Sequence, residues 1–331
     1  MMSAYDYDLP TSAIAQTPVE PRDAARLLVA VDKSGVVAHR RVSDLPDLLD
    51  EGDLLVVNET RVLPARLHLQ KATGGVVEVL LLEPLDEAGR WEALVKPGRR
   101  VGEGTTLHAG ADLSVEVGER LPDGRRAVRL NTPDPMAALA AHGEAPLPPY
   151  IHTPLAEPER YQTVYAAKPG SVAAPTAGLH LTEAILERCR ERGIGVAKVD
   201  LAVGLDTFRP VTAECAEDHH IHSERYRVPA ETLDACRGAK RVVAVGTTTV
   251  RALESAARGP LTGRTSLFIH GDFNFEVVDV LLTNFHLPRS SLLLLLASFA
   301  GERWRDLYEC ALAKGYRFLS FGDAMLVGRT R

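Results

Sequence analysis

A mixed-sheet α/β fold with a small inserted β-barrel is predicted by three features of this 331-residue sequence. Apolar runs alternate with helical patterns near both ends of the chain, as in α/β layers. The middle of the chain has short apolar runs separated by glycine-rich turns, which favours a barrel or a sandwich. A proline-rich stretch then precedes the return of the α/β pattern. We therefore predict a discontinuous α/β domain over residues 1–66 and 151–331, and a β-barrel domain over residues 67–150.

The first elements of the α/β domain follow from apolar runs and their flanking turn residues. Residues 24–31 (AARLLVAV) and 53–57 (DLLVV) predict two buried strands. The residues between them predict a short helix closed by Gly52, since glycine is common just beyond helix ends. This strand–helix–strand order is the first indication of an α/β layer.

Helix signals are clearer in the second part of the α/β domain. Thr182 precedes a helical pattern and can cap it, and Gly193 follows that pattern. A second helical pattern directly follows an apolar strand and has Gly259 beyond its end. The predicted elements are a helix over 183–192, strands over 196–203, 241–245 and 277–285, and a helix over 246–258.

The middle of the chain shows no helical pattern between residues 67 and 130. Apolar runs such as VVEVLLL, WEALVK and AVRL are divided by turns such as KATGG and LPDGRR. Evenly spaced short strands of this kind predict the barrel. Residues 144–154 (EAPLPPYIHTP) are rich in proline and predict an extended return to the α/β domain.

Composition limits the classes of partner. A 45% hydrophobic and 25% charged content is ordinary for a globular protein. The net charge of −6 excludes a general basic field, so a nucleic acid would have to be held by local Arg and Lys clusters. The run from Leu292 to Ala300 is about half of the roughly 20 residues that a bilayer requires, which favours a buried core element over a membrane span.

The cysteines and the N-terminus predict a cytoplasmic protein. The four cysteines are widely spaced and form no C-x-x-C pair, which argues against a disulfide framework and a cysteine-rich zinc site. Scattered reduced thiols suit the cytoplasm. The first ten residues lack a basic region followed by an apolar stretch, so no signal peptide is expected.

Familiar nucleotide and hydrolase signatures are missing from the sequence. It has no G-x-x-x-x-G-K-[ST] and no G-x-G-x-x-G after a strand. It also lacks H-E-x-x-H and G-x-S-x-G. These absences argue against an ATPase, a dinucleotide dehydrogenase, a zincin and a standard serine hydrolase.

The strongest local signal is RVVAVGTTTVRALES, in which a strand runs through Gly246 into a helix. Free backbone N–H groups and the helix dipole favour an anion at such a helix start. Three threonines and an arginine add donors there. An ordinary helix start with a surface arginine explains the pattern equally well. The residues concerned are Thr247, Thr248, Thr249 and Arg251.

Two further segments are candidates for ligand binding. Residues 166–182 (AAKPGSVAAPTAGLHLT) are mostly small and include Thr176, Gly178 and His180; small residues permit close backbone approach to a ligand, and the alternative is a solvent loop. Residues 218–226 (DHHIHSERY) contain His222 and Glu224. The two-residue spacing of His220 and His222 fits no usual zinc pattern, which favours acid–base work over metal binding.

Polar side chains also follow several apolar strands, where α/β proteins place ligand groups. A histidine at such a strand end can equally be a structural group with satisfied hydrogen bonds. Spacing alone does not establish that these groups converge in one pocket. The residues concerned are Asn58, Glu59, Thr60 and Arg61, then Asn284 and His286, and finally Gly322 and Asp323.

These segments together resemble one family, the S-adenosylmethionine:tRNA ribosyltransferase-isomerases. The matching blocks include YDYDLPTSAIAQTPVEPRDAARLLV, GDLLVVNETRVLPARL, GEAPLPPYI, AAKPGSVAAPTAGLHLT, HHIHSERYRVP, VVAVGTTTVRALES, VVDVLLTNFHLPRSSLL and YRFLSFGDAML. They occur in family order over nearly the whole chain. Small departures at Glu59, at Ile221 and in the short segment after Arg258 put local contacts in question rather than the reaction.

The resemblance implies a reaction and its substrates. The ribosyl group of S-adenosylmethionine moves to the aminomethyl nitrogen of 7-aminomethyl-7-deazaguanine at the tRNA wobble position and rearranges. The products are epoxyqueuosine-tRNA, adenine and methionine. The resemblance also implies a monomer whose α/β domain carries an inserted β-barrel. Neither a metal nor a resident cofactor is expected, because S-adenosylmethionine is a consumed co-substrate.

The resemblance also suggests roles for the polar residues. We expect proton transfer at His180, His222 or His286, with Glu224 as an orienting group. On the barrel, Lys96, Arg99 and Arg100 are candidates for the tRNA backbone. The candidate substrate-binding residues are Asn58, Thr60, Arg61, Thr176, Gly178, Thr247, Thr248, Thr249, Arg251, Asn284 and Asp323.

Two alternatives come from other classes of protein. One is a metal-dependent hydrolase built on the cluster between His219 and Glu224. The other is a non-catalytic RNA-binding protein whose barrel recognises folded RNA. Metal analysis tests the first, and adenine release from S-adenosylmethionine separates the second from an enzyme.

Overall fold

The computed structural model describes residues 1–32, 35–85, 89–204, 211, 213–219 and 221–330. The chain forms two compact units. The α/β unit comprises Met1–Thr60, Pro148–Lys168 and Ala174–Arg331. The barrel unit comprises Arg61–Leu147 and Pro169–Ala173.

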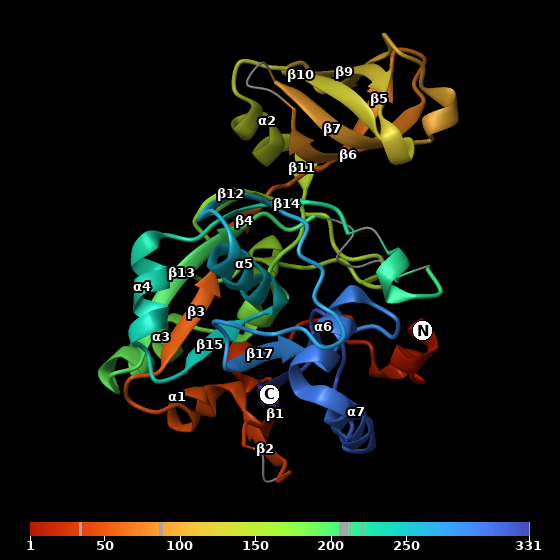
Figure 1. Ribbon diagram of the computed structural model, residues 1–331. Helices are drawn as coiled ribbons and strands as arrows, with labels where there is room; N and C mark the ends of the chain where they lie inside the picture. The colour runs from red at the N-terminus through yellow and green to blue at the C-terminus, as the bar shows by residue number, and fades with distance from the viewer. Residues whose placement is uncertain (33–34, 86–88, 205–210, 212, 220, 331) are drawn as a thin grey trace. The chain divides into compact units, whose positions relative to one another are not determined.

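A mixed sheet of nine strands forms the centre of the α/β unit (Figure 1). The strand order is β16-β14-β13-β3-β15-β17-β18-β1-β2. The inner strands β13, β3, β15 and β17 are mutually parallel, whereas β18 runs antiparallel to β17. The strands are β1 (Arg26–Ala30), β2 (Ala38–Arg41), β3 (Leu54–Asn58), β13 (Gly195–Leu201), β14 (Glu224–Arg227), β15 (Val242–Val245), β16 (Thr262–Thr265), β17 (Val280–Asn284) and β18 (Ala324–Gly328).

The inner strands are apolar runs because helices cover both of their faces. Every residue of β3, β15, β17 and β18 is buried, as expected for strands inside a layered sheet. Alternate side chains such as Leu55 and Val57 of β3 share one core with Val243, Val245 and Leu282. This core fixes the strand ends that carry the polar groups described below.

Helices pack along this sheet (Figure 1). Thr182 caps α3, its side chain accepting the Ile185 N–H at 3.2 Å, and Gly246 precedes α5 with a φ of 88° that favours glycine. Helix α5 packs on β13 and β15, and α6 on β18. The helices are α1 (Leu45–Leu48), α3 (Glu183–Glu191), α4 (Ala230–Gly238), α5 (Thr247–Arg258), α6 (Ser291–Ala300) and α7 (Trp304–Ala313).

The barrel unit is a closed antiparallel sheet. The strand order β5-β6-β7-β10-β9-β8 closes because β5 also pairs with β8. Buried and more exposed residues alternate along β7 and β9, so one side of each strand fills the interior. The elements are β5 (Arg66–Lys71), β6 (Val76–Pro84), β7 (Arg90–Lys96), β8 (Thr106–Ala109), β9 (Leu113–Arg120), β10 (Arg126–Asn131), β11 (Gly143–Glu144) and α2 (Pro135–His142).

The predicted fold class, a mixed α/β unit with an inserted β-barrel, is confirmed. Strands β4 (Thr60–Val62) and β12 (Lys168–Ser171) form an additional two-stranded sheet. The apolar run ending at Ala300 forms the buried helix α6. Within the described part of the chain, no helix combines the length and hydropathy required to span a bilayer.

One predicted strand is shorter in the structure. The apolar pattern predicted a strand over residues 277–285, but β17 begins only at Val280. The N–H groups of Val277 and Val278 donate instead to the buried carboxylate of Glu254, at 3.0 and 3.1 Å. A side chain thus replaces a neighbouring strand as the hydrogen-bond partner of this backbone.

Candidate active site

A small cavity lies where β17 ends and where the chain enters β18. It encloses about 30 Å³ within a depression of about 320 Å³. Two of its residues, Asn284 and His286, follow directly from the strand-end pattern in the sequence. The lining residues are Tyr150, Thr176, Asn284, Phe285, His286, Leu287, Ser290, Leu292, Leu319 and Ser320.

His286 is held in the cavity wall by its backbone and its ring. Its N–H donates to the Tyr308 hydroxyl at 2.8 Å, and its carbonyl accepts a bond from the Tyr7 hydroxyl. Its ring Nε2 lies 2.9 Å from Thr283 Oγ1. Burial lowers the pKa of His286 to about 3, so its imidazole is neutral at neutral pH.

Asn284 connects the cavity to a second buried histidine. Its Oδ1 accepts a bond from the Thr176 hydroxyl at 3.1 Å, and its Nδ2 lies 3.0 Å from His180 Nε2. Burial lowers the pKa of His180 to about 4, with smaller contributions from three nearby arginines. The structure therefore brings together Thr176, His180, Asn284 and His286, which come from two distant segments.

Gly178 and Asp323 lie near this group but have packing and backbone roles. A Cβ at Gly178 would lie 1.9 Å from the Tyr165 hydroxyl oxygen, so only glycine fits beside that ring. The Asp323 carboxylate accepts the N–H groups of Arg26 and Arg317 at 2.9 and 2.8 Å. Both oxygens of Asp323 thus hold the backbone that leads into β18.

The start of α5 is tied to the end of β3. Asn58 is fully buried; its Oδ1 accepts the Leu201 N–H at 3.0 Å, and its Nδ2 lies 3.3 Å from Thr248 Oγ1. Thr249 donates to the Val245 carbonyl at 2.7 Å. Thr247 is also buried beside them. Of these predicted binding residues, Asn58 and Thr248 are joined by a hydrogen bond, and Thr247 and Thr249 are buried at the same helix start.

Glu224 pairs with an arginine. Arg251 donates to Glu224 Oε2 and to the Leu267 carbonyl, while Glu224 Oε1 accepts the Gly204 N–H at 2.9 Å. Both side chains are only 8% exposed, so each charge depends on the other. Arg251 Nη2 has no hydrogen-bond partner among the described residues. His222, two residues before Glu224, is exposed.

The hydrolase alternative required a metal-binding cluster around these histidines. Among the described residues, no group of three or more His, Cys, Asp or Glu side chains is arranged to hold a metal ion. His220 lies outside the described residues. His219 packs edge-on against Phe268, at 5.4 Å between ring centroids.

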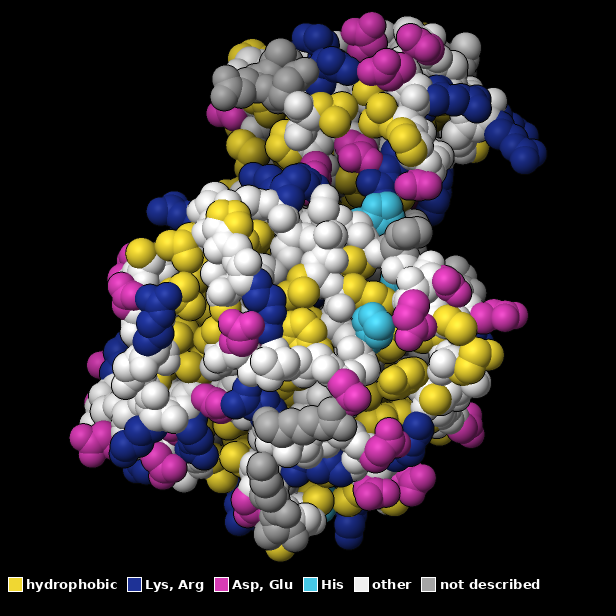
Figure 2. All heavy atoms as spheres, in the orientation of Figure 1, with side chains coloured by type: hydrophobic (Ala, Val, Ile, Leu, Met, Phe, Trp, Pro, Cys, Tyr) yellow, Lys and Arg dark blue, Asp and Glu magenta, His cyan; other side chains and the backbone are white. Residues whose placement is uncertain are grey.

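The predicted tRNA-contacting residues lie on one exposed edge of the barrel unit. Lys96 ends β7, and Arg99 and Arg100 follow in a 3₁₀ turn. The Arg100 carbonyl accepts a bond from Lys71. On the face shown in Figure 2, basic and acidic side chains are interspersed, in keeping with the net charge of −6. Of the remaining candidates, Thr60 is buried and Arg61 is half-buried.

Tyr150 and Ser320 are among the cavity residues that sequence reasoning missed. Their hydroxyl oxygens lie 2.7 Å apart in the cavity wall. Tyr150 stands in the proline-rich stretch that was interpreted only as a chain crossing. Ser320 stands two residues before Gly322, inside a segment that was singled out only for Gly322 and Asp323. Both residues lie inside blocks that carry the family resemblance, GEAPLPPYI and YRFLSFGDAML, and this was the available signal.

The arrangement suits neutral proton acceptors in a desolvated site. Two buried neutral imidazoles, each with one unprotonated ring nitrogen, can accept a proton from a bound substrate, and the surrounding hydroxyl and amide groups can orient polar atoms. Among the described residues that line the cavity, none is a Lys, Arg, Asp or Glu. The cavity therefore fits a neutral part of a ligand, and a charged part would have to lie elsewhere.

Comparison with known proteins places the chain. Residues 2–327 match a family model described as queuosine biosynthesis protein. S-adenosylmethionine:tRNA ribosyltransferase-isomerase of Thermotoga maritima is 49% identical, over 98% of this chain and 99% of the relative. The proteins of the same name from Rubrobacter xylanophilus and Thermus thermophilus are 52% and 50% identical, covering 97% and 98% of this chain and 96% and 99% of the relatives.

A solved structure agrees with these relatives. The crystal structure of S-adenosylmethionine tRNA ribosyltransferase from Thermotoga maritima matches with a TM-score of 0.56 and 39% identity. The match covers 98% of this chain and 99% of that chain. The chain therefore belongs to the queuosine biosynthesis family, the family of the S-adenosylmethionine:tRNA ribosyltransferase-isomerases.

Proposed function

We propose that this protein transfers the ribosyl group of S-adenosylmethionine to 7-aminomethyl-7-deazaguanine at the wobble position of tRNA and isomerises it. The products are epoxyqueuosine-tRNA, adenine and methionine. The observation that carries the proposal is the match to enzymes of this name over 98% of the chain. The cavity with neutral histidines at the end of β17 supplies groups that the chemistry needs.

Proton transfer is the main demand of this reaction. The sulfonium acidifies the ribosyl C5′, where a base removes a proton, and the departing adenine needs a proton in return. A ribose hydroxyl then displaces methionine and closes the epoxide. His286 and His180 are neutral in the free protein, so each is ready to accept a proton but not to donate its second one.

The direct test is adenine release. Purified protein should release adenine and methionine from S-adenosylmethionine only when tRNA carrying the aminomethyl base is present. Equal turnover without tRNA, or transfer of the methyl group to tRNA, would contradict the proposal. Binding of tRNA without any adenine release would favour the RNA-binding alternative.

We further propose that the reaction needs no metal and no resident cofactor, since the conversion of these substrates into epoxyqueuosine-tRNA, adenine and methionine requires no oxidant or reductant. Activity should survive exhaustive chelation. Loss of activity on chelation and its return with zinc would instead revive the hydrolase alternative.

We also propose that the protein is a cytoplasmic monomer. The four cysteines are free, as expected for a protein of the reducing cytoplasm. Sedimentation at micromolar concentration tests the monomer.

For the tRNA we propose contacts to the barrel at Lys96, Arg99 and Arg100. All three side chains are exposed and therefore accessible to phosphates, and the Lys96 ammonium lies 4.0 Å from the Glu78 carboxylate. Replacing both Arg99 and Arg100 by alanine should weaken tRNA binding and lower the log–log salt slope by roughly one unit per lost contact. S-adenosylmethionine binding should stay the same. An unchanged salt slope would remove this turn from the tRNA surface.

A further inference from the structure

The turn that leads into β18 is held in an unusual backbone conformation. Leu319 has a φ of 68°, in the left-handed region that branched residues rarely adopt. Its N–H donates to the Phe285 carbonyl at 3.1 Å, and its carbonyl accepts the Gly322 N–H at 2.9 Å. A Cβ at Gly322 would lie 2.4 Å from the Arg317 carbonyl oxygen, so the turn is wound too tightly for another residue there. Strain of this kind concentrates at functional sites.

The strained turn places the hydroxyl of Ser320 in the cavity wall. Ser320 is 2% exposed, and its Oγ lies 2.7 Å from the Tyr150 hydroxyl oxygen. Tyr150 is held separately, because Gln16 donates to its carbonyl and accepts the His152 N–H, both at 2.9 Å. Burial raises the pKa of the Tyr150 phenol, so the group stays protonated and can donate. The turn at Leu319 and the Gln16 hydrogen bonds to the backbone of residues 150 and 152 thus bring the two hydroxyls together.

The other polar groups of the cavity define the chemistry of its ligand. They are the hydroxyls of Thr176 and Ser290, the Asn284 amide and the neutral ring of His286. The Ser290 hydroxyl already donates to the Leu287 carbonyl and accepts the Leu293 N–H. A carboxylate or a phosphate usually pairs with cationic side chains, and the described residues of this lining include none. Hydroxyl and amide groups pair well with other hydroxyls. A hydroxyl can both donate and accept a hydrogen bond, and an amide has an N–H₂ donor and a C=O acceptor. A volume of about 30 Å³ admits about two water-sized groups.

We propose that Ser320 and Tyr150 form a binding subsite for the ribose hydroxyls of S-adenosylmethionine, with Thr176 and Asn284 completing it. This assignment rests on the proposed function for the identity of the sugar. The vicinal diol of a ribose supplies two neighbouring hydroxyls on an otherwise apolar edge. Phe285 and Leu319 offer the apolar surface against which that edge packs. The methionine and adenine portions then lie outside this cavity.

The test is equilibrium binding of S-adenosylmethionine without tRNA, so that no turnover occurs. The ligands are S-adenosylmethionine and its analogues lacking the 2′- or the 3′-hydroxyl. The variants are Ser320→Ala and Tyr150→Phe, each of which removes one hydroxyl. The matched controls are Ser255→Ala, which breaks a similar hydroxyl pair with Thr265 at 2.6 Å, and Tyr226→Phe, which loses its bond to a backbone carbonyl.

We expect Ser320→Ala and Tyr150→Phe to weaken binding of S-adenosylmethionine by about tenfold each, as for the loss of one buried hydrogen bond. Each variant should bind at least one deoxy analogue as tightly as the unaltered protein does, because the lost partner is already missing. The two controls should bind all three ligands normally. Melting temperatures of all variants check that each is folded.

Two outcomes would overturn the subsite. One is normal S-adenosylmethionine binding by both variants; the other is equal weakening for all three ligands, which indicates a structural effect. Adenine release by the unaltered protein with modified tRNA, measured in the same preparation, distinguishes a failure of the subsite from a failure of the proposed function. If adenine is released while the variants show no coupling to a ribose hydroxyl, the subsite is wrong and the proposed function stands. If no adenine is released, the proposed function fails first.

Discussion

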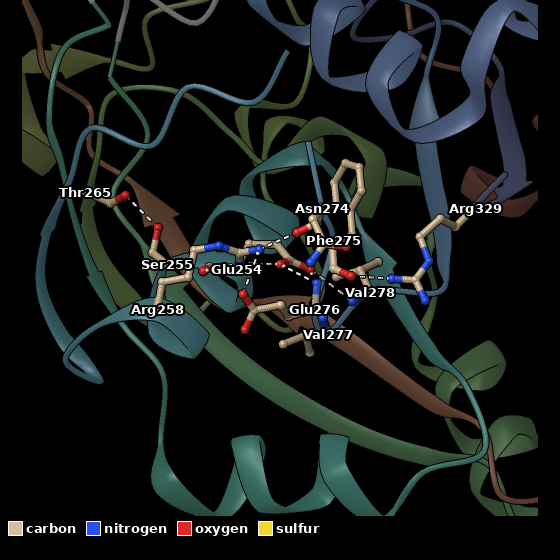
Figure 3. A network of polar contacts seen from close by, with 10 residues as sticks. All are labelled: Glu254, Ser255, Arg258, Thr265, Asn274, Phe275, Glu276, Val277, Val278 and Arg329. Carbon is tan, nitrogen blue, oxygen red and sulfur yellow. Dashed lines mark hydrogen bonds and ion pairs between the residues drawn. The ribbon is translucent and has the colours of Figure 1, made fainter. Parts of the chain in front are cut away.

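The polar groups at the two ends of β17 differ in their hydrogen-bond partners. Before the strand, the fully buried carboxylate of Glu254 accepts three backbone N–H groups, from Glu276, Val277 and Val278, and pairs with Arg258 at 2.6 Å (Figure 3). After the strand, the side chains around the cavity bond mainly to one another, in pairs such as Thr283–His286 and Tyr150–Ser320.

Both carboxylate oxygens of Glu254 accept hydrogen bonds, whereas two buried hydroxyl groups in the region around His180 have no hydrogen-bond partner among the described residues. These are the hydroxyls of Thr163 and Tyr165, which flank Gly178. A satisfied buried network stabilises and rigidifies a fold. An unsatisfied buried polar group requires an explanation, and a ligand or an ordered water is the usual one. Polarity alone therefore does not identify a site; the number of partners separates structure from function.

The largest difference between the two ends of β17 is expected when His286 is replaced, because the variant should lose catalytic rate and keep substrate binding. Replacement by glutamine keeps a similar size and a donor, so the loss falls on proton transfer. We expect the single-turnover rate of adenine release to fall by about 10²–10⁴-fold while substrate binding survives. Rapid-quench measurement with saturating tRNA checks this. Near-normal chemistry would move the proton-transfer role to His180 or His222.

The reverse result is expected at Glu254. In Glu254→Gln, an amide N–H₂ would face backbone donors, and Arg258 would lose its ion pair. We expect the free energy of unfolding to fall by about 3 kcal/mol, because each bond to the charged group contributes about 1.5–3 kcal/mol and only part is lost. Urea denaturation measures the change. The folded fraction should keep its rate of adenine release, and a large loss of that rate would break the contrast between the two ends of β17.

The pH dependence of stability is a smaller effect of the site end. Burial lowers the pKa of His286 to about 3 and that of His180 to about 4 in the folded protein, from an ordinary value of about 6.5. Between pH 6.5 and 4 the unfolded chain binds protons that the folded protein does not. The contribution of the two neutral histidines to the free energy of unfolding is therefore fully present above pH 6.5. It decreases as the pH drops, by about 1 kcal/mol per pH unit for each histidine.

Single variants isolate this term from the titration of carboxylates. Urea midpoints at pH 7.5, 6.5 and 5.5 should fall less steeply in His180→Gln and in His286→Gln than in the unaltered protein. Ser255, drawn in Figure 3, bonds to Thr265, so Ser255→Ala serves as the control whose slope should not change. Identical slopes in all four proteins would mean that the two rings are not held neutral.

The sequence alone determined the layered α/β unit, the barrel and the strand ends that carry polar groups. Apolar periodicity, the Thr182 cap and the glycine before α5 are local signals, and local physics decides them. The family blocks added the reaction. Asn284 and His286 were found in the same way, because a polar residue after a buried strand is visible without knowing its neighbours.

Tertiary structure alone decided which polar groups meet. Glu224, expected near a histidine, is paired with Arg251 from another element, and Asn58 bonds to Leu201, which lies 143 residues away in the chain. The Tyr150–Ser320 pair joins residues 170 positions apart, through a turn whose left-handed Leu319 no local preference predicts. The physical reason is that side-chain partners and strained backbone are set by packing between distant segments, and a spacing pattern holds no information about such contacts.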